Sequence, residues 1–206
     1  MGNDLKLYKY YQIADRIKSG SNVLDIGCGG GGLGEALTGK GCNLIGWDLS
    51  PDRTQERGKF YDSLVKKDIE KEEFGQEKYD VIVLADVLEH LTYPEKVLKK
   101  SRESLNSGGI VLVSLPNVAY LDNRIGLLKG NWNYTDHGIL DRTHLKFFTL
   151  FTAEQLLLSA GYRIQEIDPE TPSINSVWKS NIFSILSEAW PGLFAIGWVF
   201  QVEPVK

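Results

Sequence analysis

A glycine-rich segment with a carboxylate in front of it is the part of this sequence best suited to bind a cofactor. Residues 23–34 read VLDIGCGGGGLG, with six glycines and with Asp25 two positions before the first of them. The run matches G-x-G-x-x-G, follows a strand pattern and opens a helix pattern, as in folds that bind dinucleotides. Glycines suit such a turn because a Cβ atom would hold the backbone away from a bound ligand.

The carboxylate of Asp25 opposes a phosphorylated ligand. In a dinucleotide site, the helix N-terminus and the bare backbone amides receive a pyrophosphate. A carboxylate about 4 Å away would repel that group by roughly 4 kcal/mol at an effective dielectric near 20. This argues against an NAD-dependent dehydrogenase. A nucleoside triphosphatase is excluded because no Gly-Lys-Ser/Thr follows the glycines. The segment favours S-adenosylmethionine, which lacks phosphate and carries a sulfonium and an ammonium group.

Three further aspartates follow predicted strands. Asp48 ends the second strand, Asp68 the third and Asp86 the fourth, with Glu89 one helical turn later. In an open sheet the ligand lies beyond the carboxyl ends of the strands, so we expect these acids and Asp25 to converge on one crevice. Asp48 is placed to accept hydrogen bonds from both ribose hydroxyls. Each acid could instead cap the helix that follows it.

Short β-branched runs alternate with helical patterns along the chain. This alternation predicts an α/β, doubly wound, Rossmann-like fold with a mostly parallel sheet. Ser50 and Thr152 are the expected N-caps of two of the helices. We expect strands at 22–26, 43–47, 63–67, 79–85, 110–115, 162–167 and 195–202, and helices at 33–38, 51–59, 94–105 and 152–160.

Composition and charge exclude several classes of protein. The 206 residues fit one domain, 1–206, and the formal net charge of −4 with interleaved acids and bases argues against a nucleic-acid partner. Cys28 and Cys42 belong to no paired Cys/His pattern, so neither a disulfide nor a metal site is expected. The first twenty residues do not read as a signal peptide, which makes the cytoplasm the default compartment.

Two later segments depart from the alternating pattern. Residues 117–148 are rich in aromatic side chains, including Trp132 and Tyr134, and predict an insertion that covers the substrate. These rings could line an acceptor pocket or form the core of the insertion. Residues 182–202 are apolar, but Glu188 and Pro191 interrupt them, which favours a buried helix followed by a core strand over a membrane contact.

Five segments in order resemble the successive motifs of the class I S-adenosylmethionine-dependent methyltransferases. They are VLDIGCGGG, LIGWDLS, VKKDIE, YDVIVLADVLEHL and LNSGGIVLVSLPN, which together cover residues 22–117. A later segment, LDRTHLKFFT at 140–149, resembles the small-molecule branch with ubiquinone-type, sugar-modifying and MetW-like members. The resemblance implies that the last of the seven strands is antiparallel and inserted beside the fifth.

The resemblance also implies which residues hold the cofactor. Cys28 is included because it lies in the glycine turn, although a small side chain that the turn tolerates explains it as well. The candidates are Asp25, Gly27, Cys28 and Gly29 on the methionyl side, Asp48 and Leu49 at the ribose, Asp68 and Ile69 at the adenine, and Ala85 and Asp86 closing the pocket.

Histidines are the candidate proton acceptors. Methyl transfer needs mainly alignment and exclusion of water, but an alcohol acceptor must also lose a proton, most often to histidine. Of the three histidines, His144 is the candidate base, with Asp141 placed to orient its imidazole, and His90 lies near the crevice. His144 could also be a structural hydrogen-bonding residue, and His137 is the weakest candidate.

These observations predict a methyltransferase that uses S-adenosylmethionine, yields S-adenosylhomocysteine and acts on a small molecule, with oxygen as the acceptor atom. The acceptor class is a sugar, a phenol or a quinone-like compound. The alternative is a catalytically silent subunit that binds the cofactor and acts through a protein partner.

Overall fold

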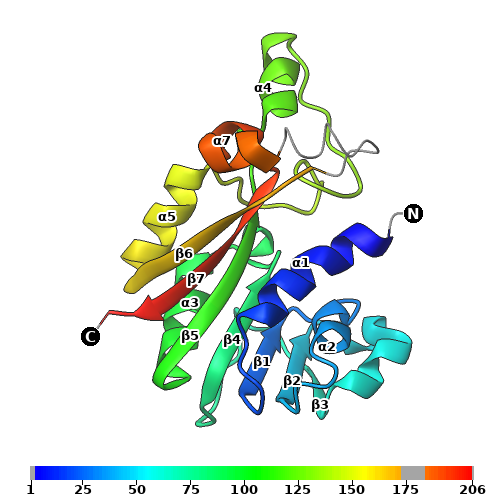
Figure 1. The fold of residues 1–206 in the computed structure, drawn as a ribbon, viewed down its shortest axis with the longest axis vertical. Coiled ribbons are helices and arrows are strands. Elements are labelled where there is room, and N and C mark those ends of the chain that lie inside the picture. Colours follow the sequence, from blue (N-terminus) through cyan, green and yellow to red (C-terminus); the bar gives the residue numbers. More distant parts are fainter. Residues whose placement is uncertain (1–2, 173–183, 206) are drawn as a thin grey trace.

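The computed structural model describes residues 3–172 and 184–205, and within these ranges seven strands form one sheet (Figure 1). The strands are β1 Asn22–Ile26, β2 Asn43–Asp48, β3 Ser63–Lys66, β4 Tyr79–Ala85, β5 Leu105–Pro116, β6 Tyr162–Glu170 and β7 Gly197–Pro204. Their order is β3-β2-β1-β4-β5-β7-β6, and β7 is antiparallel to both neighbours. The predicted doubly wound sheet is confirmed, and so is the antiparallel last strand beside the fifth.

Helices cover both faces of the sheet (Figure 1). The α-helices are α1 Asn3–Asp15, α2 Gly32–Ala36, α3 Pro94–Glu103, α4 Leu121–Leu128, α5 Leu150–Ser159 and α7 Pro191–Phe194, and the 3₁₀ helices are η1 Pro51–Phe60 and η2 Leu88–His90. Side chains of α1 and α2 pack in one buried cluster and those of α3 and α5 in the other.

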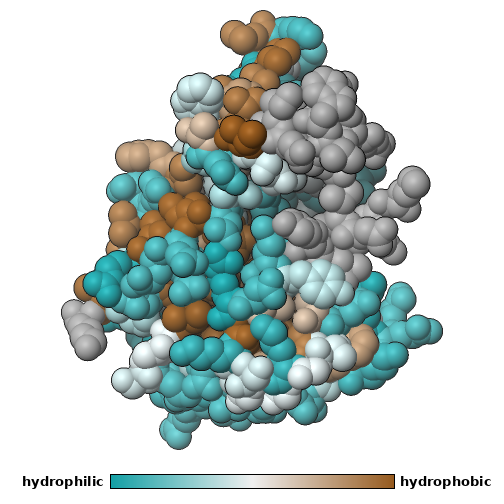
Figure 2. All heavy atoms as spheres, in the orientation of Figure 1, coloured by the Kyte–Doolittle hydropathy of each residue, from teal (hydrophilic) through white to brown (hydrophobic). Residues whose placement is uncertain are grey.

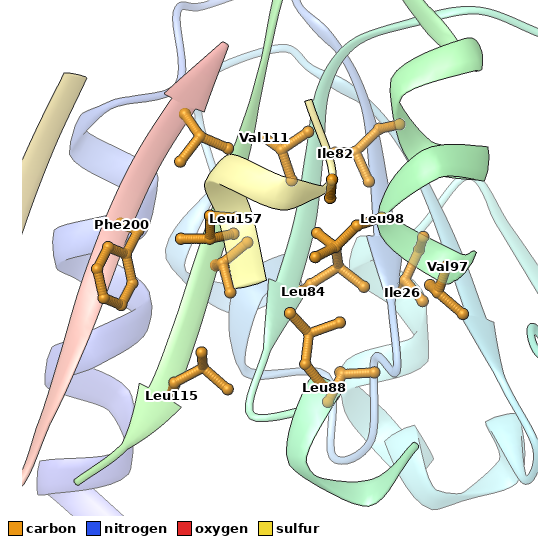
Figure 3. Packing of buried hydrophobic residues seen from close by; sticks show 14 of the residues in the cluster. Ile26, Ile82, Leu84, Leu88, Val97, Leu98, Val111, Leu115, Leu157 and Phe200 are labelled. Carbon is orange, nitrogen blue, oxygen red and sulfur yellow. The ribbon is translucent and has the colours of Figure 1, made fainter. Parts of the chain in front are cut away.

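The central strand β4 supplies alternate side chains to both clusters. Val81 and Val83 pack with α1 and α2, whereas Ile82 and Leu84 face α3 and α5, where Leu98 meets them (Figure 3). Successive strand residues point to opposite faces, so a strand covered on both sides must be apolar throughout. Each such side chain contributes roughly 1.5–3 kcal/mol by leaving water. This burial fixes the strand ends that carry the acids.

Three predicted helices differ from the structure, two in their bounds and one in its type and cap, for local reasons. The helix expected to reach Leu105 ends at Glu103, because Leu105 already pairs with Tyr79 and the polar residues after it form an irregular start of β5. The helix after Ser50 is 3₁₀, and Ser50 makes no side-chain cap. Helix α5 is capped by Thr149, whose side chain and amide exchange hydrogen bonds with Thr152.

The apolar segment near the C-terminus is a core strand but not a buried helix. Strand β7 is buried against β5 and β6, as expected, whereas residues 184–189 form a helix on which Ile185 is largely exposed, and Trp190 after it is exposed as well. Pro191 starts a separate short helix, so the apolar residues do not share one continuous helical face. Residues 182–183 lie outside the described residues. In the described part of the chain, no helix has both the length and the apolarity to cross a membrane.

The predicted insertion, residues 117–148, projects beyond the carboxyl ends of the parallel strands (Figure 1). It holds α4, none of whose residues is buried, and its ends meet through a bridge between Asn117 and Phe148. Apolar side chains gather over α4 on the molecular surface (Figure 2), and Leu128 there is 88% exposed. The insertion therefore stands over the edge of the sheet at which ligands bind in open α/β folds.

Replacing Gly32 by alanine should destabilise the protein. Alanine is intrinsically favoured over glycine in a helix, but a methyl at Gly32 would lie 2.4 Å from the ring of Tyr10 and would push α1 away. We expect a loss of about 1–3 kcal/mol in the free energy of unfolding, measured by chemical denaturation. Gly30→Ala is the control, because a methyl there meets open space. Equal stability of Gly32→Ala and the wild type would contradict the packing described.

Candidate cofactor and acceptor site

The glycine turn after β1 lies against the end of β2. Gly27 and Gly29 have positive φ angles of 72° and 47°, and a Cβ atom on Gly27 would lie 2.5 Å from Val87. The amides of Gly27 and Cys28 both donate to the carbonyl oxygen of Trp47, at 2.7 and 3.2 Å. Backbone conformation thus favours glycine at both positions, and at Gly27 close contact requires it as well, whatever ligand the turn binds.

Asp48 ties the glycine turn to β2 through its side chain. One carboxylate oxygen accepts a hydrogen bond from the Gly29 amide at 2.9 Å, and the other accepts from the Ser50 amide at 2.7 Å. Leu49 beside it is 61% exposed. Each carboxylate oxygen has a second lone pair, so Asp48 retains acceptor capacity for ribose hydroxyls.

Asp25 lies beneath the turn rather than on the rim of the crevice. Its side chain is 2% exposed and accepts a hydrogen bond from the hydroxyl of Tyr61 at 2.7 Å. Burial raises the pKa of Asp25 to about 7, opposed by the Tyr61 hydrogen bond and helped by the charge of Asp48. Sequence analysis missed Tyr61, and no local pattern connects it to an acid 36 positions earlier.

Asp86 follows β4 in a strained conformation and is paired with a lysine from the N-terminal helix. It has a positive φ of 54°, accepts a hydrogen bond from Ser114 Oγ at 2.7 Å, and binds Lys9 Nζ through both oxygens at 2.6 and 2.7 Å. Lys9 also lies 3.0 Å from Glu170 at the end of β6. Burial alone would lower the pKa of Lys9, but the two carboxylates raise it, so the ammonium stays charged. Sequence analysis missed Lys9 and Glu170.

Asp68 is separated from the other three acids by its position after the edge strand β3. Its carboxylate accepts hydrogen bonds from Lys71 Nζ and the Glu70 amide. The neighbouring Ile69 is buried and lines a shallow groove of about 270 Å³ between this segment and Tyr93 near the start of α3. The groove is compatible with the expected adenine contact of Ile69, whereas the Asp68 side chain is held by its own segment.

His144 lies beside a buried glutamate. Its Nδ1 atom is 3.1 Å from the carbonyl oxygen of Ile139, and its Nε2 atom is 4.0 Å from Glu89 Oε1. Burial and the neighbouring His90, whose ring centroid is 4.8 Å away, lower the pKa of His144. His144 is therefore neutral near pH 7, which leaves one ring nitrogen able to accept a proton.

The expectation that Asp141 orients this imidazole is wrong. The Asp141 carboxylate instead accepts hydrogen bonds from the amide and the hydroxyl of Thr143, two residues later. Aspartate commonly closes a turn in this way, and both of these hydrogen bonds are accepted by Oδ1. The acid nearest the imidazole is Glu89, whose carbonyl oxygen also accepts from the amides of Leu145 and Lys146.

The carboxyl group of Glu89 is buried without a hydrogen-bond partner among the described residues. Burial and the charge of Asp86 raise its pKa well above the usual range. One ligand atom each from Glu89, His90 and His144 lie within 4.8 Å of one another, a spacing at which one divalent ion could reach all three. The sequence has no local metal motif here because His144 comes from the insertion.

Aromatic rings of the insertion lie next to His144. The ring centroid of Phe147 is 6.1 Å from that of His144 and 5.4 Å from that of Trp132, and Tyr134 packs edge-on against Trp132. Tyr134 is 53% exposed, so the cluster is not the sealed core of a subdomain. Of the two open interpretations, this exposure favours an acceptor-pocket wall. His137 is exposed. Its main-chain carbonyl oxygen accepts a hydrogen bond from the Thr135 hydroxyl.

Comparison with known proteins agrees with this arrangement. A family described as a methyltransferase domain matches residues 7–167, more than half of the chain. The chain belongs to this family. The chain resembles a ubiquinone biosynthesis O-methyltransferase of Psychrobacter arcticus, with 28% identity over 161 residues, 72% of this chain and 62% of that relative. Its counterpart from Glaesserella parasuis is 30% identical over 109 residues, 48% of this chain and 46% of that relative. The chain thus spans about half to three-fifths of the length of these relatives.

Solved structures share the fold of this chain. An S-adenosylmethionine-dependent methyltransferase from Archaeoglobus fulgidus aligns with a TM-score of 0.67 at 20% identity, covering 97% of this chain and 93% of that one. Magnesium protoporphyrin IX methyltransferase from Synechocystis, solved with bound S-adenosylhomocysteine, aligns with a TM-score of 0.63 at 15% identity, covering 97% and 82%. At such identities the likeness establishes the fold alone.

Asp25→Asn should stabilise the protein, and more so at pH 8 than at pH 5. The pKa of Asp25 is about 7 in the folded chain and about 3.9 when unfolded, so the native state loses stability as pH rises from 4 to 7. Asparagine stays neutral and can still accept from Tyr61. We expect the gain in unfolding free energy to grow by up to about 1.4 kcal/mol per pH unit below pH 7, measured by urea denaturation without cofactor. A gain that does not vary with pH would contradict the assigned pKa.

Proposed function

We propose that this chain binds S-adenosylmethionine and transfers its methyl group to a hydroxyl group of a small molecule. The observation that carries the proposal is the carboxylate lining of the glycine turn. The Gly29 amide, which a dinucleotide site would offer to pyrophosphate, already donates to Asp48, and Asp25 lies directly below. Two carboxyl groups at this place favour a cationic nucleoside and disfavour a phosphorylated one.

The residues present fit the cofactor. Asp48 has lone pairs for the ribose hydroxyls, and within the described ranges Tyr61 is the only donor to the Asp25 carboxylate, which leaves one Asp25 oxygen without a protein partner. The groove beside Ile69 can receive the adenine ring. S-adenosylmethionine supplies a methyl group on a positively charged sulfur, and S-adenosylhomocysteine is the product. The remaining cofactor assignments, Gly27, Cys28, Ala85 and Asp86, keep their expected roles in this proposal.

The acceptor side of the proposal rests on His144 and the aromatic rings around it. A neutral imidazole takes the proton of the acceptor hydroxyl as the oxygen attacks, while His90 and Glu89 line the same space. The aromatic wall of Trp132 and Phe147 suits a flat ring. Relatives named ubiquinone biosynthesis O-methyltransferases support a quinone-like or phenolic acceptor. They also make a silent accessory subunit the weaker alternative.

Asp48→Ala should weaken cofactor binding at least about tenfold, because hydrogen bonds from ribose to a charged acceptor are lost. Isothermal titration calorimetry with S-adenosylmethionine measures the effect, and NAD should give no binding heat to the wild type. Asp62→Ala is the matched control, because Asp62 also accepts a backbone amide, that of Leu44, but at the amino end of β3. Unchanged affinity of Asp48→Ala, or loss in both variants alike, would contradict the ribose role.

His144→Ala should lower the rate of methyl transfer about a hundredfold or more with little change in cofactor affinity. The rate is followed as S-adenosylhomocysteine formed with a panel of catechols, phenols and hydroxylated quinone precursors. The assay is repeated with a chelator, because Glu89, His90 and His144 are close enough to share an ion. An unchanged rate in the variant would contradict the base role. A chelator-induced loss that divalent ions restore would assign His144 to metal binding instead.

A further inference from the structure

Tyr61 connects the acid beneath the glycine turn to the start of α2. Its hydroxyl donates to Asp25 Oδ2 at 2.7 Å and accepts from the Gly34 amide at 3.3 Å. Both Tyr61 and Asp25 are buried. Because the hydroxyl proton can be given to only one acceptor, and the Gly34 amide already points at the oxygen, the direction of the hydrogen bond is fixed toward Asp25.

Two glycines leave room for the ring of Tyr61. A Cβ atom on Gly34 would lie 2.5 Å from the ring, and one on Gly46 would lie 2.9 Å from it. Gly34 is on α2 and Gly46 is in the middle of β2, where neither has a positive φ that would call for glycine. These two glycines therefore provide space for an aromatic side chain between the helix and the sheet.

We propose that Tyr61 is a positioning residue for the cofactor, which favours the ionised form of Asp25 and orients its carboxyl group so that the free oxygen faces the methionyl end of the crevice. The inference rests on the proposed function, since it takes S-adenosylmethionine as the ligand. It adds a residue that contacts no ligand itself and lies in none of the segments that carry the family resemblance.

The groups around Asp25 make its charge sensitive to this one hydrogen bond. Besides Tyr61, the ionisable side chains that act on it are Asp48 from β2, Cys28 in the turn and Tyr10 from α1. Burial raises the pKa of Cys28 to about 12 and also raises those of Tyr10 and Tyr61, so all three keep their protons at neutral pH. Among these effects on Asp25, burial and the charge of Asp48 raise its pKa, whereas the Tyr61 hydroxyl lowers it.

The sign of the effect on binding follows directly. An ionised Asp25 attracts the sulfonium and ammonium groups, so cofactor affinity should increase as pH rises through about 7. Loss of the Tyr61 hydroxyl removes the contribution that lowers the pKa of Asp25. The pH at which affinity increases should then move upward.

The test is the dissociation constant of S-adenosylmethionine between pH 6 and 9, measured by calorimetry on the wild type and on Tyr61→Phe. We expect the midpoint to move up by at least about half a pH unit, and the affinity at pH 7 therefore to fall at least about twofold. Comparing variants with one ligand cancels the titration of the cofactor itself. Tyr162→Phe is the matched control, because the buried Tyr162 hydroxyl donates to the Leu98 carbonyl on the other face of the sheet.

Asp25→Asn separates this inference from the proposed function. If its affinity still varies with pH as in the wild type, Asp25 does not contact the cofactor as proposed. If Asp25→Asn lacks the rise in affinity that the wild type shows through about pH 7, while Tyr61→Phe behaves like Tyr162→Phe, the positioning role of Tyr61 is wrong and the proposed function stands. Should Tyr61→Phe melt below the assay temperature, 3-fluorotyrosine at position 61 keeps the ring and donates more strongly, so the midpoint should move down. An unmoved midpoint would overturn the role.

Discussion

The structure depends on a backbone reversal after β1 that is held by the carboxylate of Asp48 and the main-chain carbonyl of Trp47. The Gly29 amide donates to Asp48 and the amides of Gly27 and Cys28 donate to the Trp47 carbonyl, so the turn is fastened to β2 along both of its sides. Only a chain with positive φ at Gly27 and Gly29 can make this approach. In a phosphate-binding turn these amides would face an anionic ligand. Here the protein supplies the anion itself, and the ligand must be complementary to it.

The charges around the crevice are paired in two different ways. Asp25 is buried with a hydroxyl donor and no cation, so its pKa rises, whereas Lys9 keeps the pKa of Asp86 below its usual range although burial opposes this. Lys9 belongs to α1 and also contacts Glu170 on β6, and Arg16 of the same helix pairs with Asp168. One helix thus spans from the glycine turn to the far edge of the sheet. Asp25 and Asp48 thus keep the capacity to accept hydrogen bonds, whereas the charge of Asp86 is balanced by Lys9.

Local patterns were enough to predict the strands and the acids at their ends, because each is set by neighbours in the sequence. The apolar run 79–85 is β4 to the residue, and Asp48 and Asp86 follow β2 and β4 as expected. The contacts that define the site join distant parts of the chain and have no such signal. Tyr61 and Asp25 are 36 positions apart in the sequence, and Lys9 and Asp86 are 77 apart. Asp141 instead accepts a hydrogen bond from Thr143 within its own turn. Sequence spacing suggested Asp141 as the acid beside His144, but tertiary packing places Glu89 there, 4.0 Å from its Nε2 atom.

The buried carboxyl group of Glu89 explains how the acceptor side is organised. Its main-chain oxygen holds the amides of Leu145 and Lys146, so the insertion is anchored at the residue whose side chain faces His144. The 4.0 Å separation from Nε2 is too long for a hydrogen bond, and the carboxyl oxygens have no partner among the described residues. A buried polar group without a hydrogen-bond partner lowers the stability of the folded protein by about 1–3 kcal/mol. The packing of the core does not require a carboxyl group at this position. This unpaired carboxyl group lies where two histidines and the aromatic rings meet, which is the space that the proposed function assigns to the methyl acceptor.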